Sequence, residues 1–373
     1  MAAVDLGALA RNLRVVRRIV GPRVGIMAVV KANAYGHGAV PVARTLVAAG
    51  ASWLGVASIE EACELRAAGG ITAPILVLRG LEPADVTQAI ALDLTAVVWD
   101  LTGAARLAAA VPRGKRLAVH LKIDTGMHRL GADPSDLARI AGGIKRLPLA
   151  VTGVMSHLAC ADEPGHPSFA DQLGAFEQGL AVLAAAGLEP ATRHIANSAG
   201  LLADPRAHFD LVRPGIMLYG GLPHPSHAAR AALEPVMHLS ARIVQLREVP
   251  AGARIGYGHT FTCRRPTRIA VLPIGYADGY LRSLSNCGEV LVRGRRAPVV
   301  GRISMDHTTV DVTDVPRVET GDPVTLWGED AGARLDVMEI GARAGTIGYE
   351  VLARVGSRVP RVHFGGEETS DHE

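Results

Sequence analysis

Eight short apolar segments recur between Val24 and Tyr219, and their number and spacing constrain the fold more than any other feature. They are rich in Val, Ile and Leu and lack strict polar alternation. Strands of this kind are buried on both faces, as in a parallel sheet. The segments are VGIMAVVK, SWLGVAS, PILVLRG, LTAVVWD, RLAVHLKID, LAVTGVMSH, TRHIAN and DLVRPG.

Helix-like segments lie between these strands. IEEACELRAAG places Ile59, Ala62 and Leu65 on one face, and DQLGAFEQGLAVLAAAG begins at a capping residue, Asp171, and ends at Gly187. Eight βα units predict a (β/α)₈ TIM-type barrel in an α/β protein. A doubly wound open sheet also alternates strands and helices, but it rarely needs eight units.

The pattern changes after about Leu233. Short β segments, several of them alternating, are separated there by Gly, Pro and Asp turns, and one helix is expected over residues 337–344. We therefore predict a barrel domain over residues 1–230 and a mainly β domain over residues 231–373. The polar tail GGEETSDHE is expected to fray.

Composition excludes several classes of function. The 39 basic residues nearly balance 36 acidic ones and form no stripe, which argues against nucleic-acid binding. No apolar run reaches the ~18 residues of a membrane span, and the start lacks a signal-peptide core. We expect a cytoplasmic enzyme. Widely spaced cysteines predict buried free thiols and no disulfide or metal site; they are Cys63, Cys160, Cys263 and Cys287.

Barrel enzymes carry their chemistry at the C-terminal ends of the strands. The first strand ends in Lys31, which on its own could close an ordinary strand and point into water. Other strand ends also carry cations and hydrogen-bonding groups, namely Tyr35, Lys122, Arg129, His157, Asn197, Ser198, Arg213 and Gly215. Neighbouring cations and apolar walls disfavour an ammonium ion, which makes Lys31 a better nucleophilic amine.

Two glycine-containing segments, ANSAG and RPGIMLYG, offer backbone N–H groups that could hold one phosphate. A lysine able to form a Schiff base, next to a phosphate site, points to pyridoxal 5'-phosphate (PLP) as cofactor.

Longer motifs make this interpretation specific. They are VVKANAYGHG, KIDTGMHRLG, HIANSAG, VRPGIMLYG, IGYGHTF, PIGYADGY, GRISMDH and TIGYE. The series resembles that of the alanine racemases, in the same order and over nearly the whole chain. Two positions differ, because His128 often has glycine in its place and Gly348 often asparagine. The resemblance implies a barrel, a C-terminal β domain and a head-to-tail homodimer with shared active sites. It also implies interconversion of L- and D-alanine, which supplies D-alanine for peptidoglycan.

The resemblance assigns the two catalytic bases. Lys31 would bind PLP covalently and then act as one base, and Tyr257 of a second subunit would act from the opposite face of the substrate. A tyrosine on the rim of the molecule, with its hydroxyl in water, is the alternative interpretation of Tyr257. His157 and Arg213 would help Tyr257 through a hydrogen-bonded chain that leads to the cofactor ring.

Arg213 is expected to face the pyridine nitrogen of PLP. Because a guanidinium holds its proton far more tightly than a pyridinium, the ring nitrogen should stay unprotonated. A weaker electron sink suits a racemase better than a decarboxylase. The alternative is that Arg213 pairs with Asp210 at a strand end.

The remaining roles also follow from the resemblance. Arg129 would contact the phenolic oxygen of PLP and the substrate carboxylate, and Lys122 matches a lysine that is often carbamylated. The backbone N–H of Met305 would meet the substrate carboxylate from the second subunit. Contacts to the phosphate or ring are expected from Tyr35, Asn197, Ser198, Gly215, Ile216 and Tyr349. A substrate corridor, or equally a solvated surface, is expected at Asp162, Tyr276, Arg282 and Arg302.

Three other functions share parts of this pattern. A racemase acting on serine or a basic amino acid would differ only in its pocket. Barrel-plus-β-domain decarboxylases share the architecture, but Arg213 argues against them. PLP-carrying homeostasis proteins resemble an isolated barrel, so the β domain with Tyr257 and Met305 argues against that class.

Overall fold

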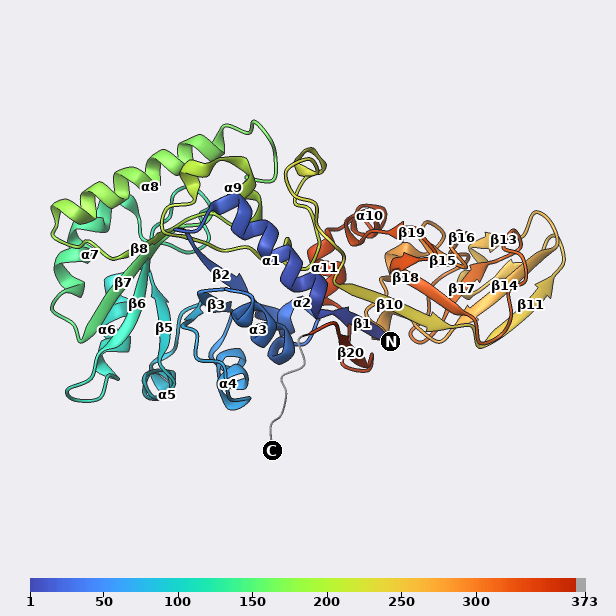
Figure 1. Cartoon of the computed structure of the whole chain (residues 1–373), viewed down its shortest axis with the longest axis horizontal. Helices are drawn as coiled ribbons and strands as arrows, with labels where there is room; N and C mark the ends of the chain where they lie inside the picture. Colours follow the sequence, from blue (N-terminus) through green and yellow to red (C-terminus); the bar gives the residue numbers. More distant parts are fainter. Residues whose placement is uncertain (367–373) are drawn as a thin grey trace.

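The computed structural model describes residues 1–366, so most of the tail expected to fray lies outside the described residues. Eight parallel strands form one curved sheet in the order β8-β7-β6-β5-β4-β3-β2-β9 (Figure 1). All eight predicted strands are present, which confirms the α/β barrel. Their bounds are β2 (Gly25–Val29), β3 (Trp53–Val56), β4 (Ile75–Val77), β5 (Leu94–Val98), β6 (Leu117–Lys122), β7 (Leu149–Met155), β8 (Thr192–His194) and β9 (Leu211–Val212).

The seam between β8 and β9 brings the barrel close to full closure. Asp210 donates its backbone N–H to the Arg193 carbonyl at 3.1 Å, and Arg213 donates to the Ala196 carbonyl at 2.9 Å. On its other side β9 pairs in parallel with β2. The first and last strands of the barrel therefore lie next to each other.

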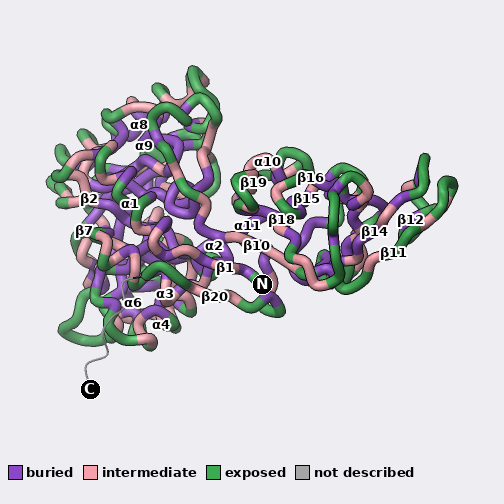
Figure 2. Tube along the Cα trace, turned by 45° about the vertical axis from the view of Figure 1, so that its right-hand side comes forward, coloured by how far each residue is buried: buried purple, intermediate pink, exposed green. Residues whose placement is uncertain are grey.

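Helices surround the barrel, and its centre is buried (Figure 2). Helix α4 begins at Ile59 as predicted, with Ile59, Ala62 and Leu65 buried. Helix α8 begins at Ser168 rather than at Asp171, whose expected capping role is wrong. The barrel helices are α1 (Leu6–Val20), α2 (Lys31–Tyr35), α3 (Ala39–Ala48), α4 (Ile59–Ala67), α5 (Val86–Ala91), α6 (Leu101–Ala109), α7 (Leu137–Ile144), α8 (Ser168–Ala185) and α9 (Ser198–Ala203).

The C-terminal part is mainly β, as predicted. A seven-stranded sheet has the order β16-β15-β18-β10-β1-β20, with β19 paired to β18. It contains β1 (Ala2–Asp5), β10 (Met237–Arg242), β15 (Glu289–Val292), β16 (Arg295–Pro298), β18 (Pro323–Asp330), β19 (Ala333–Leu335) and β20 (Arg361–Phe364). Strand β1 thus joins the N-terminus to this sheet, antiparallel to β10 and parallel to β20.

Two smaller sheets extend the β domain away from the barrel (Figure 1). They are built from β11 (Gln245–Val249), β14 (Thr267–Leu272) and β17 (Thr308–Asp311), and from β12 (Arg254–Ile255) and β13 (Phe261–Thr262). Two helices follow where one was predicted, α10 (Val337–Arg343) and α11 (Gly348–Ala353). The second was missed because it is short and begins at a glycine.

Segments from the C-terminal part pack against the turn that carries Lys31. The Tyr349 ring of α11 lies 6.2 Å from the Tyr35 ring of α2. From β20, Arg361 Nε donates to the Gly36 carbonyl at 3.0 Å, and His363 Nε2 lies 2.7 Å from the His37 carbonyl oxygen. The end of α2 is therefore held by two segments of the C-terminal part.

All four cysteines are unpaired. Cys263 is buried, but Cys287 is exposed, so the expectation that all the thiols are buried is wrong. Among residues 1–366, no helix has both the length and the apolar character to cross a membrane.

Candidate active site

Lys31 begins an unusual turn at the C-terminal end of β2. The four residues Ala32–Tyr35 have φ between 52° and 54°, and Gly36 follows at 81°. A non-glycine residue in this left-handed region costs about 1–2 kcal/mol, so four in succession need strong support from their surroundings. Part of it is local, because Asn33 Oδ1 accepts the backbone N–H of Ala39 at 2.7 Å.

The surroundings of Lys31 disfavour its positive charge. The Lys31 side chain lies at the open mouth of the barrel, yet nearby protein removes much of its hydration. This desolvation lowers the pKa of its ammonium group, and the cations Arg129 and Arg213 lower it further. Glu61 acts in the opposite direction. The electrostatics therefore agree with the expected nucleophilic amine.

Arg213 is held by several acceptors. Its Nη1 donates to His194 Nδ1 at 2.8 Å, and its Nη2 donates to the Ser156 carbonyl at 2.6 Å and to His157 Nδ1 at 3.1 Å. The residue is only 4% exposed, and burial lowers the pKa of its guanidinium to about 9. Arg213 thus stays cationic at neutral pH.

The alternative partner proposed for Arg213 is engaged elsewhere. Asp210 accepts from Arg193, with Arg193 Nε and Asp210 Oδ2 2.7 Å apart. The pairing of Arg213 with Asp210 is therefore wrong. Both residues lie near the same seam, but the Arg213 side chain enters the barrel.

A chain of neutral histidines extends from Arg213. Because a guanidinium only donates, Nδ1 of both His157 and His194 must accept. Burial and the charge of Arg213 lower the pKa values of both rings well below the usual range. His194 Nε2 lies 2.9 Å from His120 Nδ1. Sequence analysis missed His120 and His194, although a histidine inside an apolar strand is the signal that could have found them.

Lys122 ends β6 close to the same cations. It is 6% exposed, and desolvation together with Arg213 and Arg129 lowers the pKa of its ammonium to about 8. The following loop turns on Asp124, whose Oδ1 accepts the backbone N–H groups of Gly126, Met127 and His128. His128 has φ of 54°, where glycine would be relaxed.

Residues expected to contact the phosphate also lie close together, around Gly215. Ser198 Oγ accepts the Gly215 N–H at 2.9 Å, and a Cβ on Gly215 would lie 2.5 Å from Tyr35 Oη. The N–H of Ile216 has no acceptor among residues 1–366. Two hydroxyl groups and an unpaired N–H around a glycine fit a phosphate group. Asn197 caps α9 next to them through the Gly200 N–H.

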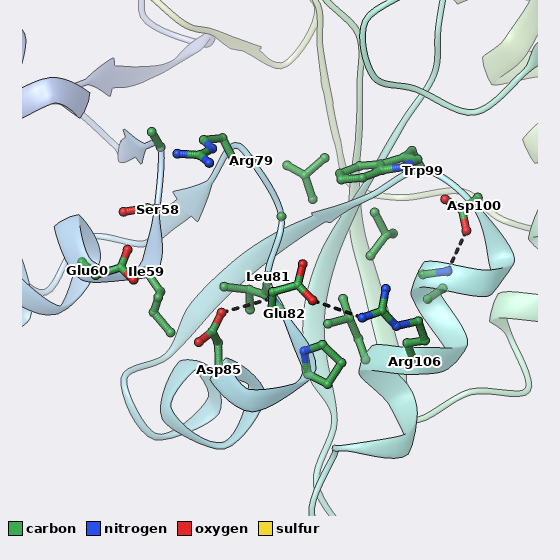
Figure 3. Close-up of a pocket in the computed structure, with 18 residues that line it drawn as sticks. Ser58, Ile59, Glu60, Arg79, Leu81, Glu82, Asp85, Trp99, Asp100 and Arg106 are labelled. Carbon is green, nitrogen blue, oxygen red and sulfur yellow. Dashed lines mark hydrogen bonds and ion pairs between the residues drawn. The ribbon is translucent and has the colours of Figure 1, made fainter.

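A separate crevice opens at the exits of β3, β4 and β5 (Figure 3). Its volume is about 460 Å³, and Glu60, Arg79, Trp99 and an Arg106–Glu82 ion pair line it. None of the residues predicted for the site lines this crevice. The described residues also contain no group of His, Cys, Asp or Glu side chains arranged to hold a metal ion.

The residues assigned to a second subunit lie on the β domain. Tyr257 is 72% exposed and Met305 52% exposed, and within residues 1–366 no hydrogen bond or ring contact joins either to Lys31. The corridor residues Arg282 and Arg302 are also exposed, and Tyr276 is 41% exposed. One chain therefore brings together the site residues predicted on the barrel. The residues of the β domain named above lie apart from them.

Two family models match this chain. Residues 4–223 match the N-terminal domain of alanine racemase, and residues 236–363 match the C-terminal domain. An alanine racemase from Symbiobacterium thermophilum is 47% identical over 98% of this chain and 97% of its own length.

Solved structures agree with these matches. The alanine racemase of Streptomyces lavendulae has a TM-score of 0.94 and 42% identity, over 100% of this chain and 98% of that one. The Bartonella henselae alanine racemase, described with covalently bound pyridoxal phosphate, has a TM-score of 0.88 and 34% identity, over 98% of this chain and 99% of that one.

Proposed function

Because the chain belongs to the alanine racemase family and is an amino-acid racemase, we propose that it interconverts L- and D-alanine with PLP bound to Lys31. The observation that carries the proposal is the arrangement at the barrel mouth. A lysine with a lowered pKa lies near an arginine that stays cationic, where a decarboxylase would need a carboxylate.

The residues present fit PLP. When bound, the cofactor draws electrons away from the substrate Cα and makes the proton there acidic. The phosphate would be held by Tyr35, Ser198, Gly215, Ile216 and Tyr349. Arg213 would donate to the ring nitrogen, Asn197 would support the ring, and Arg129 would contact the phenolic oxygen and the substrate carboxylate.

Racemisation requires a proton to leave one face of Cα and another to arrive at the opposite face. Lys31 Nζ would serve one face, and Tyr257 Oη of a second copy would serve the other. His157 is suited to link Tyr257 with Arg213, because its Nδ1 accepts from Arg213 and its Nε2 must carry the ring proton. This chain of donors would stabilise a tyrosinate at Tyr257.

Lys122 is suited to carbamylation. Its lowered pKa leaves a fraction of neutral amine at neutral pH, and that amine can attack carbon dioxide. The new bond joins Nζ to carbon, and one proton leaves to water. The resulting anion would pair with Arg129 and replace a repulsion between two cations.

The exposure of the β-domain residues supports a homodimer with shared sites. We propose that a barrel over residues 1–230 and a β domain over residues 231–373 meet the opposite domains of a second copy. Met305 would then approach the substrate carboxylate, and the substrate corridor would be formed by Asp162, Tyr276, Arg282 and Arg302. Four unpaired cysteines favour the reducing cytoplasm, where D-alanine would be supplied for peptidoglycan.

A direct assay tests this proposal. The purified protein with PLP is incubated with L-alanine and, separately, with L-serine, L-lysine and L-arginine, and each D-product is quantified by chiral chromatography. Preferential formation of D-alanine is expected. Preference for another amino acid would contradict the substrate. Bound PLP with no D-product would contradict racemisation and favour a carrier or a decarboxylase.

A further inference from the structure

One carboxylate outside the predicted site holds the segment that carries Lys31. Glu61 lies in the first turn of α4. Its Oε1 accepts the backbone N–H of Ala32 at 2.7 Å, and its Oε2 accepts that of Ala57 at 2.6 Å. Ala32 directly follows Lys31, and Ala57 directly follows β3. The two oxygens of one side chain thus join the exits of two neighbouring strands.

This bridge needs a carboxylate. Both partners are N–H donors, and a carboxylate can accept with each oxygen, whereas an amide offers one acceptor and one donor group. Hydrogen bonds to an ionised acceptor are also stronger than neutral ones. The first turn of a helix favours a negative charge, so α4 supports Glu61 in this state.

The bridge acts where the backbone is most strained. Ala32 is the first of the four residues Ala32–Tyr35 at positive φ, and β20 and α11 support the other end of that turn. Glu61 supplies the anchor at its beginning. Without this anchor the turn could relax towards ordinary backbone angles, and Lys31, one residue away, would move with it.

Glu61 also balances the charges around Lys31. Besides desolvation, the charged groups that shift the pKa of this amine are Arg129 and Arg213, which lower it, and Glu61, which raises it. Two of these groups are cations, and Glu61 is the anion. A site that places several cations near its lysine therefore retains one carboxylate beside the lysine's own backbone.

We propose that Glu61 is a positioning residue for Lys31, which fixes the start of the left-handed turn and supplies the counter-charge to its amine. The inference rests on the proposed function in one respect, namely that Lys31 carries PLP. It assigns Glu61 no contact with substrate or cofactor.

Two substitutions separate the geometric role from the electrostatic one. Glu61→Gln removes the charge and one of the two acceptors. Glu61→Asp keeps the charge but is one methylene shorter, so it cannot reach both N–H groups. Glu60→Gln is the matched control, because Glu60 lies in the same helical turn, is exposed and faces the crevice instead (Figure 3).

The first measurement is the pH dependence of PLP attachment. Full-length protein freed of PLP is mixed with PLP at a series of pH values and reduced with borohydride, and the Lys31 adduct is quantified by peptide mass spectrometry. Loss of the anion lowers the pKa of the Lys31 ammonium further, so neutral amine persists to lower pH. The midpoint should fall by about one pH unit in Glu61→Gln. It should stay unchanged in Glu61→Asp and Glu60→Gln.

The second measurement is the turnover number of the PLP-loaded enzyme. It should fall roughly ten-fold in both Glu61 variants, because small displacements of a reacting group are costly. Glu60→Gln should match the unmodified protein, and thermal unfolding of each variant checks that the chain still folds.

The possible outcomes separate the inference from the function. An unchanged pH midpoint in Glu61→Gln, or an equal shift in Glu60→Gln, would overturn the counter-charge. Unchanged turnover in Glu61→Asp would overturn the anchoring role. If the unmodified protein forms no D-alanine but the midpoint still shifts in Glu61→Gln alone, the proposed function fails and the role of Glu61 stands. An adduct on another lysine overturns both.

Discussion

The two proposed bases lie in contrasting surroundings. Lys31 begins a turn that Glu61, α11 and β20 contact, and desolvation together with the cations Arg129 and Arg213 lowers the pKa of its amine. Tyr257 lies between the two-residue strands β12 and β13, and 72% of it is exposed. Figure 2 shows β12 at the end of the β domain farthest from the barrel. The barrel half of the proposed site is thus built within one chain, whereas in the proposed homodimer the Tyr257 half would be completed by a second copy.

The backbone conformations around Lys31 and Tyr257 also differ. Around Lys31, four non-glycine residues adopt positive φ because packed neighbours hold them there. Around Tyr257, the positive φ angles fall mainly on Gly256 and Gly258, which adopt them without strain. Folding of one chain therefore fixes the Lys31 turn, whereas Tyr257 would be ordered only by association in the proposed homodimer.

The largest expected effect is from Lys31→Ala. Removing the amine removes covalent attachment of PLP, so the PLP–lysine absorbance should disappear and racemisation should fall by at least ~10⁴-fold. Absorbance spectra and the chiral assay measure this. Lys115→Ala, at an exposed lysine between α6 and β6, should leave both signals intact. Persistence of the absorbance in Lys31→Ala would mean that another lysine binds the cofactor.

Tyr257→Phe should lower racemisation of both enantiomers by about 10²–10⁴-fold, the usual contribution of a general acid–base group. Each direction needs both bases, but exchange of the α-proton with solvent needs only one. In deuterated water, one enantiomer should therefore keep its exchange while the other loses it, with PLP still bound. Equal exchange from both enantiomers, as in the unmodified protein, would contradict the role of Tyr257.

Mixing the two inactive variants tests whether the site is shared. In a hybrid dimer, Lys31 of one chain meets Tyr257 of the other and completes one of the two sites. Random reassociation of equal amounts should restore about a quarter of the sites. The chiral assay before and after mixing measures this recovery. Mixtures that stay inactive, although mass spectrometry detects hybrids, would place both bases in the same chain.

The sequence predicts the strands and the strand-end residues of the barrel half, but not the local backbone conformation around Lys31. Two-sided burial gives eight strands, and the strand-end rule gathers Lys31, Lys122 and Arg213. The left-handed turn could not be predicted, because alanine, asparagine and tyrosine seldom adopt it and distant segments impose it. Likewise, β1 is four residues long, and its partners β10 and β20 both lie in the C-terminal part of the chain, far from it in sequence.

Other features of the fold and of the site could not be predicted, because they depend on contacts that form only in the folded chain. His120 and His194 lie inside apolar strands, where only the folded barrel brings their rings together. The segment LSARIVQLREV looks like one strand but forms β10 and β11, in different sheets. At Gly348 a side chain would meet Met338 Sδ at 2.4 Å, a contact that the motif alone does not reveal.

The smallest expected effect concerns Lys122, whose proposed carbamate would balance the cations of the barrel half. Because the pKa of its ammonium is lowered to about 8, the neutral amine that reacts with carbon dioxide grows from pH 6 to pH 8. With ¹³C-bicarbonate, an NMR carbamate signal should rise over that range and be absent from Lys122→Arg. Turnover of this variant should fall only about three- to ten-fold, because the variant loses the orientation of Arg129 but keeps both bases.

Lys115→Arg should keep both the signal and the turnover. If Lys122→Arg retains full turnover, Arg129 is positioned without a carbamate, and the barrel half of the site tolerates two neighbouring cations.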